Sequence, residues 1–138
     1  MHPPTDSLSL RVLVVEDELV TAESLALFLR SWGHEVTLAC NGPDALSMVS
    51  TFQPEVVLLD IGLPNMDGYE VARRLRRLPG MGKCLLMTLT GQGYEFDLRR
   101  FKEAGIDFHF LKPVEPALLR EVLSSAGKFR REQGQLIS

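Results

Sequence analysis

The fold of this chain is decided by the stretch VVLLDIGLPNMDG, residues 56–68. Its first four residues are all apolar and show no alternation with polar ones, as expected of a strand that is covered on both faces. The strand ends at Asp60, a loop containing Pro64 follows, and Asp67-Gly68 then precedes a helical pattern. A fully buried strand that leads through a loop into a helix is the building unit of an α/β protein with a parallel sheet.

The same unit recurs along the chain. We expect apolar strands at 11–15, 34–39, 56–59, 84–89 and 108–111. Helical spacing of apolar residues predicts helices at 18–32, from 41 onward, and at about 67–78, 94–104 and 115–125. Strict alternation of strands and helices implies right-handed crossovers and a parallel sheet with helices on both faces.

Length and composition bound the organisation of the chain. Its 138 residues, 45% hydrophobic and 24% charged, suit one globular domain, which we place at 10–126 between tails at 1–9 and 127–138. We expect the polar second tail to be frayed. A net charge of −3 gives no electrostatic reason to bind nucleic acid or an anionic membrane. Because no apolar run approaches the roughly 20 residues that span a bilayer, and no leader pattern is present, we expect a cytoplasmic protein.

The chain has two cysteines, Cys40 and Cys84. They are far apart in the sequence and have no histidine or further cysteine at metal-ligand spacing, so zinc binding is unsupported. A disulfide is not expected in a reducing compartment. We therefore predict that both are buried, reduced thiols.

Polar residues follow four of the five expected strands: Glu16-Asp17, Asp60, Thr90 and Lys112-Pro113. In an open parallel sheet the carboxyl ends of the strands meet at one edge, where ligands bind. Each residue alone could be a helix cap or a surface side chain, but core packing does not require all of them at one edge. Clustered carboxylates favour a divalent cation such as Mg²⁺, and an aspartate beside a metal and a lysine can attack a phosphoryl group.

The order and spacing of four motifs identify a family. The strings VLVVEDE (12–18), LLDIGLPNMDG (58–68), LTG (89–91) and FLKPV (110–114) together resemble the response-regulator receiver domain of two-component signalling, over about residues 10–126. The resemblance implies a flavodoxin-like (βα)5 three-layer sandwich with five parallel strands in the order 2-1-3-4-5.

The resemblance also implies roles for individual residues. Asp60 would be the phosphoacceptor, with Thr90 and Lys112 each binding a phosphoryl oxygen. Mg²⁺ or Mn²⁺ would be held directly by Asp17, Asp60 and the backbone carbonyl of Gly62, and by Glu16 through water. The Lys112-Pro113 peptide bond is expected to be cis, which proline permits.

Two positions modify this pattern. His109 stands where the family usually has Tyr or Phe, the ring that turns inward when the threonine responds, and we interpret it as a half-buried polar residue rather than a pH sensor. Gln92, two residues after Thr90, could weakly influence how long the phosphoryl group survives.

The implied function is a phosphoacceptor switch, not an enzyme with turnover. A sensor histidine kinase or a histidine phosphotransfer protein would donate the phosphoryl group to Asp60. Altered protein contacts would be the output, including a possible homodimer through the face formed by the expected helix at 94–104, strand at 108–111 and helix at 115–125. We expect the chain to bind neither nucleic acid nor membrane. It would be a stand-alone regulator or the receiver of a larger protein such as a hybrid kinase.

Other functions remain as alternatives. One is a receiver-like interaction module that is independent of phosphorylation. A metal-dependent phosphatase with an aspartyl nucleophile is less well supported, because its D-x-D-x-T signature would need an aspartate where Leu19 stands. Flavin binding lacks a phosphate-cradling loop after the first strand. The arginines at 73, 74, 76 and 77 are interpreted as a solvated helix face, supported by Glu70 at i,i+4 from Arg74.

Overall fold

Five apolar segments form one parallel sheet in a computed structural model of the chain, which describes residues 9–64, 66–91 and 97–137, with side chains as far as 126. The order is β2-β1-β3-β4-β5, as expected. The strands are β1 (Arg11–Val15), β2 (Glu35–Ala39), β3 (Val56–Asp60), β4 (Leu85–Thr90) and β5 (Phe108–Leu111). β1 and β3 lie in the middle of the sheet, so their unbroken apolar runs are buried on both faces.

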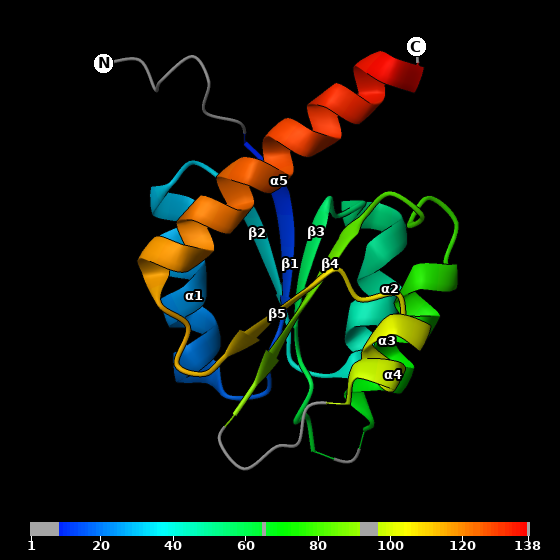
Figure 1. Ribbon diagram of the computed structural model, residues 1–138. Coiled ribbons are helices and arrows are strands. Elements are labelled where there is room, and N and C mark those ends of the chain that lie inside the picture. The colour runs from blue at the N-terminus through cyan, green and yellow to red at the C-terminus, as the bar shows by residue number, and fades with distance from the viewer. Residues whose placement is uncertain (1–8, 65, 92–96, 138) are drawn as a thin grey trace.

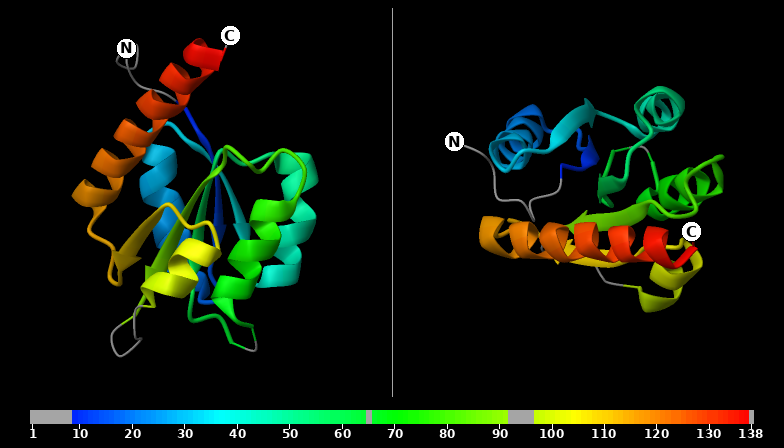
Figure 2. Two further views of the ribbon diagram at one scale, coloured as in Figure 1. Left: turned by 45° about the vertical axis from the view of Figure 1, so that its right-hand side comes forward. Right: turned by 90° about the horizontal axis from the view of Figure 1, so that it is seen from above.

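Helices cover both faces of the sheet (Figures 1 and 2). The first group, α1 (Leu19–Ser31) and α5 (Pro116–Ile137), lies on one face. The second group, α2 (Gly42–Phe52), α3 (Gly68–Arg77) and α4 (Leu98–Glu103), lies on the other. This three-layer arrangement confirms the predicted fold class.

Successive residues of a strand point into different cores. Val12 and Val14 of β1 pack with α1 and α5, whereas Leu13 and Val15 pack with α2 and α3. All four side chains are fully buried. A strand that serves two cores must be apolar at every position, which is why its sequence shows no alternation.

Short polar side chains cap the N-termini of the three helices on the second face, α2, α3 and α4. Asn41 accepts a hydrogen bond from the amide of Asp44 at 2.8 Å, and Asp67 accepts one from Tyr69 at 3.0 Å. Asp97 does the same for Arg100 at 3.1 Å. These N-caps satisfy backbone donors that have no partner within the helix, and so fix where each helix starts after its strand.

Some sequence expectations require correction. The last helix does not end near residue 125 but continues to Ile137, because the polar residues beyond 127 have good helix propensity and do not interrupt it. Cys40 is exposed, since it lies just after β2 at the sheet edge, while Cys84 is buried as predicted. Phe28 of α1 has the helical spacing of its apolar residues but is 43% exposed. Among the described residues, no helix is both long and apolar enough to cross a membrane.

Candidate functional site

The carboxyl ends of β1, β3, β4 and β5 bring the predicted site residues to one edge of the sheet, the lower edge in Figure 1. Glu16 and Asp17 follow β1 directly, and Asp60 and Thr90 are the last residues of β3 and β4. Lys112 follows β5. Because the order of the sheet places β3 between β1 and β4, Asp60 lies in the middle of this edge.

Three carboxylates form an acidic cluster. Glu16, Asp17 and Asp60 each offer an oxygen, and these oxygens lie within 4.8 Å of one another. Glu16 and Asp60 are 2% and 5% exposed, whereas Asp17 is exposed to solvent. Like charges this close repel, so the cluster favours a cation.

Lys112 supplies a positive charge to this cluster. Its Nζ donates to Glu16 Oε1 at 2.6 Å and to Asp60 Oδ2 at 2.8 Å. Its backbone amide donates to the carbonyl of Thr90 at 2.7 Å, which ties the end of β5 to the end of β4. The predicted cis peptide bond between Lys112 and Pro113 is confirmed.

Burial and the hydrogen bonds of the Lys112 ammonium group together set the protonation of Glu16 and Lys112. Burial raises the pKa of Glu16 to about 7, although the hydrogen bond from Lys112 lowers it. Burial lowers the pKa of Lys112, but the hydrogen bonds to Asp60 and Glu16 outweigh burial and raise it above its ordinary value. Lys112 is therefore charged at neutral pH, while Glu16 titrates near it.

The two oxygens of Asp60 have different partners. Oδ2 accepts from Lys112, whereas Oδ1 accepts from the backbone amide of Gly62 at 2.9 Å. Gly62 is exposed, and a Cβ built on it would lie 3.5 Å from Oδ1. The Gly62 amide thus orients the Asp60 carboxylate, and because Gly62 has no side chain it does not cover that carboxylate.

Thr90 and His109 lie beside this centre on the neighbouring strands. Thr90 is buried, and Leu89, the residue before it, pairs with Asp60 across the ladder between β3 and β4. His109 pairs with Thr88, is half-buried, and meets the ring of Phe101 edge-on with centroids 6.4 Å apart. Burial lowers the pKa of His109. Gln92 lies outside the described residues.

The donor set fits a hard divalent cation. Mg²⁺ prefers oxygen ligands, keeps several waters, and is commonly bound by one or two carboxylates. The cluster provides such carboxylates, and Asp17 is open to solvent, which leaves room for water ligands. There are no cysteine or histidine ligands in the cluster, so its chemistry matches magnesium or manganese better than zinc.

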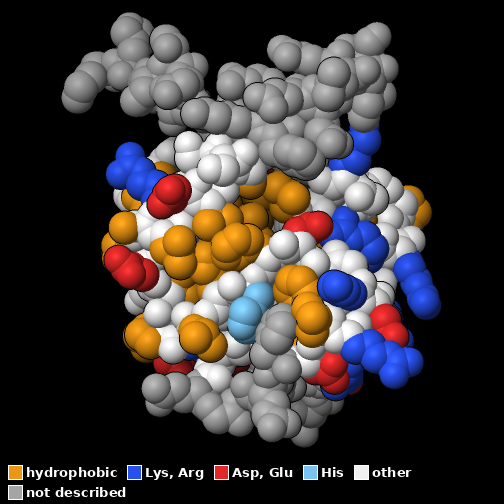
Figure 3. Space-filling view, viewed as in Figure 1, with side chains coloured by type: hydrophobic (Ala, Val, Ile, Leu, Met, Phe, Trp, Pro, Cys, Tyr) orange, Lys and Arg blue, Asp and Glu red, His pale blue; other side chains and the backbone are white. Residues whose placement is uncertain are grey.

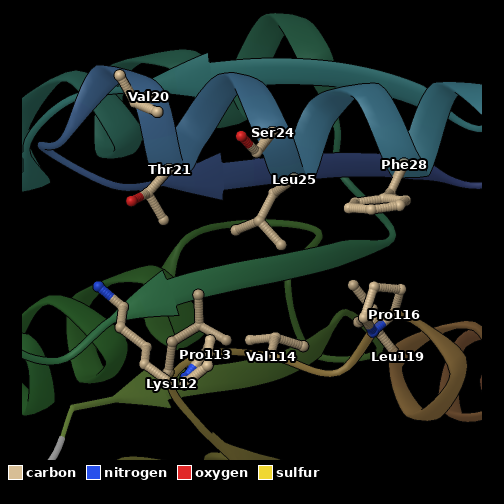
Figure 4. A pocket seen from close by; sticks show the side chains of 11 residues that line it. Val20, Thr21, Ser24, Leu25, Phe28, Lys112, Pro113, Val114, Pro116 and Leu119 are labelled. Atoms are coloured by element: carbon tan, nitrogen blue, oxygen red, sulfur yellow. The ribbon is translucent and has the colours of Figure 1, made fainter.

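A groove that the sequence did not reveal opens beside Lys112 (Figure 4). It has a volume of about 590 Å³ and runs between α1 and the segment that joins β5 to α5. Val20, Leu25 and Phe28 line it from α1, and Pro113 and Val114 from the other side. The one indication in the sequence was that α1 carries more apolar residues than one buried stripe requires.

Two arginines, Arg76 and Arg100, make contacts that the sequence did not predict. Arg76 was expected on a solvated face but turns into the molecule, where it donates to backbone carbonyls and to Asp107. Arg100 of α4 forms an ion pair with Asp67. Arg74 does pair with Glu70, as predicted, and Arg73 pairs with the same carboxylate. Spacing along one helix reveals the pairs to Glu70, but contacts between elements need the tertiary structure.

Comparison with known proteins assigns the family. The chain matches the profile of the response regulator receiver domain over residues 12–124. It is 33% identical over 108 residues to the transcriptional regulatory protein AfsQ1 of Streptomyces coelicolor, covering 78% of this chain and 47% of AfsQ1. It is 35% identical over 111 residues to the DNA-binding response regulator MtrA of Mycobacterium tuberculosis, covering 80% and 47% respectively.

The chain thus spans about half the length of these curated relatives. MtrA is described as DNA-binding, so the absence of nucleic-acid binding stays a prediction for the chain described here.

Solved structures agree with this assignment. The receiver domain of the sensor histidine kinase PA1611 from Pseudomonas aeruginosa, which has magnesium coordinated in its active-site cleft, superposes with a TM-score of 0.77 at 28% identity, covering 87% of this chain and 99% of that one. A CheY-like receiver domain from Methylobacillus flagellatus gives 0.78 at 28% identity, covering 86% and 99%. The chain therefore belongs to the response regulator receiver domain family of two-component systems.

Proposed function

We propose that the chain accepts a phosphoryl group on Asp60 from a phosphohistidine of a sensor histidine kinase or a histidine phosphotransfer protein. The observation that carries this proposal is the position of Asp60, which is buried among two further carboxylates and hydrogen-bonded to Lys112 at 2.8 Å. A carboxylate held in this way is a nucleophile with a positive charge beside the site where negative charge develops.

The transfer proceeds in one displacement. A carboxylate oxygen of Asp60 forms a bond to phosphorus while the bond between phosphorus and the imidazole nitrogen of the donor breaks, and the electron pair returns to that imidazole. The product is an acyl phosphate. Lys112 binds a phosphoryl oxygen, and the hydroxyl of Thr90 binds another, so the residues that flank Asp60 neutralise its added charge.

The acidic cluster would hold Mg²⁺ or Mn²⁺. Asp17 and Asp60 would be direct ligands together with the carbonyl of Gly62, and Glu16 would act through water. When bound, the ion would neutralise charge on the transferred group and reduce the repulsion between the phosphoryl oxygens and the Asp60 carboxylate. The residues of the chain then orient Asp60, through the amide of Gly62 and the ammonium of Lys112.

Two surfaces of the chain would make its protein contacts, one with the phosphodonor and one after phosphorylation. The groove of Figure 4 would receive an apolar helix face of the phosphodonor, because it has apolar walls and leads to Lys112. Apolar side chains also gather on the front face over β5 and α5 (Figure 3), where Phe108, Leu111 and Leu118 are exposed. A homodimer through α4, β5 and α5 would cover them.

We further propose that the chain acts as a switch, with no catalytic turnover of other substrates. It would be phosphorylated once and would lose the group by slow hydrolysis. Thr90 on β4 and His109 on β5 would transmit the change, since β4 lies between β3, which carries Asp60, and β5. Gln92 would modulate the rate of hydrolysis.

The test is incubation with phosphoramidate, a small phosphodonor, and Mg²⁺, followed by intact mass measurement. We expect the mass to rise by one phosphoryl group in the wild type and in Asp44→Asn, an acidic residue outside the cluster. Asp60→Asn should show no gain. A wild-type chain that gains no mass, or an Asp60→Asn variant that gains it equally, would refute the proposal.

A further inference from the structure

Helix α4 is held to the rest of the molecule by few contacts. It spans only Leu98–Glu103, and none of these residues is buried. Its C-terminal turn is fixed, because Arg76 of α3 donates from Nη2 to the carbonyl of Gly105 at 2.6 Å. Phe101 in the middle of the helix packs half-buried against the core and the ring of His109. An element anchored at its middle and at one end can pivot at the other, so the contacts of its first turn help to decide its position.

The first turn of α4 is held by Asp67. One oxygen of Asp67, Oδ1, caps α3 by accepting from the Tyr69 amide at 3.0 Å, and the other, Oδ2, forms an ion pair with Arg100 of α4. The Arg100 guanidinium also lies 4.5 Å from the centre of the Tyr69 ring, which is buried. Arg100 is thus bound by a charge and by an aromatic face on the same turn of α3.

These two residues belong to the segments that leave the site. Asp67 ends the loop that starts at Asp60 and includes Gly62, and Arg100 lies on the helix that follows Thr90. An interaction between them therefore joins the segments after β3 and β4. A response that carries the first turn of α4 away from α3 lengthens or breaks this ion pair.

We propose that the Asp67–Arg100 pair is a latch that holds α4 in its resting position and opposes the phosphorylated state. This inference rests on the proposed phosphorylation of Asp60. A contact made in the resting state and lost in the switched state stabilises the resting state by its own free energy. By linkage, removing the contact raises the population of the switched state and the ease of phosphorylation.

The chain provides a matched control on the same helix. Arg99 pairs with Glu103 at 3.0 Å, but both residues belong to α4. This pair moves with the helix as a unit and cannot restrain it. Arg99→Gln removes the same charge and also removes an ion pair, but it leaves the contacts of Arg100 with Asp67 and with the Tyr69 ring intact.

The experiment measures the rate of phosphorylation by phosphoramidate with Mg²⁺ for the full chain. The latch variants are Arg100→Gln and Asp67→Asn, since an asparagine keeps an oxygen for the Tyr69 amide. We expect each to react about twofold to fivefold faster than the wild type, the range that a half-exposed ion pair can supply. The double variant should be no faster than either single variant, and Arg99→Gln should match the wild type.

Rates that are unchanged or reduced in both latch variants, or raised equally in Arg99→Gln, would overturn the latch. Amide hydrogen exchange of residues 98–103 without a phosphodonor is a second readout. Faster exchange in Arg100→Gln than in Arg99→Gln supports the latch, and equal exchange contradicts it. A wild type that takes up no phosphoryl group refutes the proposed function instead, and the exchange experiment then still decides whether the latch exists.

Discussion

At the scale of single residues, the site is a balance between Lys112 and three carboxylates. Glu16 and Asp60 share the ammonium group of Lys112, whereas Asp17 has no such contact with it and faces solvent. One cation does not offset this acidic cluster, and the pKa of Glu16, raised by burial to about 7, reflects the cost of holding a further charge there. A divalent cation would relieve the repulsion.

We predict that Mg²⁺ raises the thermal midpoint of unfolding, because it binds the folded cluster and not the unfolded chain. Asp17→Asn should weaken this effect, shifting the Mg²⁺ concentration needed by about tenfold or more. Glu18→Gln, which removes a neighbouring charge outside the cluster, should leave it nearly unchanged. Thermal unfolding of the wild type and of both variants at several Mg²⁺ concentrations measures the three responses. Equal responses in the two variants would show that the cation binds elsewhere.

His34 gives the chain a pH dependence away from the site. Its Nδ1 accepts a hydrogen bond from the amide of Leu10 at 3.1 Å, and burial lowers its pKa. The unfolded chain therefore binds a proton more readily than the folded chain as the pH falls through about 6.5, the ordinary histidine value. His34 therefore stabilises the folded chain above that pH, and this contribution is lost as the pH falls below it.

We predict that the free energy of unfolding falls less between pH 7.5 and about 5.5 in His34→Asn than in the wild type. The asparagine oxygen can accept from the same amide but takes up no proton. Urea unfolding at both pH values measures the difference. Glu16 acts in the opposite direction in this range, since its raised pKa favours the folded chain as the pH falls, and it is common to both proteins. Parallel pH profiles would contradict the assignment.

At the scale of elements, Arg76 joins α3 to the segments before β4 and β5. Its Nη1 donates to the carbonyls of Met81 and Cys84 at 2.9 and 2.6 Å. Its Nη2 donates to Gly105 and to Asp107 Oδ2 at 2.6 and 2.9 Å. These carbonyls lie in turns outside the sheet ladders, so one side chain closes two turns; the carbonyl of Met81 also accepts from the Cys84 amide.

We predict that Arg76→Met destabilises the chain by about 2–3 kcal/mol, because it removes the guanidinium donor from the carbonyls of Cys84 and Gly105 and breaks the ion pair with Asp107. Arg77→Met, the exposed neighbour on the same helix, should change stability by less than about 0.5 kcal/mol. The free energy of unfolding from urea titration measures both. A similar small change in the two variants would mean that water replaces the guanidinium at no cost.

At the scale of the whole molecule, the sheet separates two cores and exposes one functional edge. The register of β1, β3, β4 and β5 decides which side chains reach this edge, because a slip of one residue would move each strand's last residue along the edge and exchange the two cores that its side chains face. The groove beside Lys112 likewise exists only because α1 and α5 lie on the same face of the sheet.

The overall packing also gives the two thiols different reactivity. Cys40 is exposed at the site edge, whereas Cys84 is 4% exposed and packs in the core with α2 and α3. We predict that a thiol reagent such as Ellman's reagent labels Cys40 rapidly in the folded chain and Cys84 only on unfolding. The Cys40→Ser variant is the control, and should show only the slow reaction. Rapid labelling of Cys84 would show that this core opens readily.

The sequence by itself determined the alternation of strands and helices and the candidates at the strand ends. Both follow from local physics: runs such as residues 56–59 suit only a strand with two covered faces, and residues such as Asp60 sit where such a run stops. The strand order came from the family resemblance and not from periodicity. All five strands were found in place, with boundaries shifted by a residue at most.

Only the tertiary structure decided which side chains meet across elements. Lys112 bonding to Glu16 and Asp60, Arg76 turning inward, and Arg100 pairing with Asp67 all join residues far apart in the sequence. Periodicity reports which face of an element is apolar, but not what lies opposite that face. The same limit explains why the exposure of Cys40 was missed: burial depends on packing of the whole chain, and not on residue type alone.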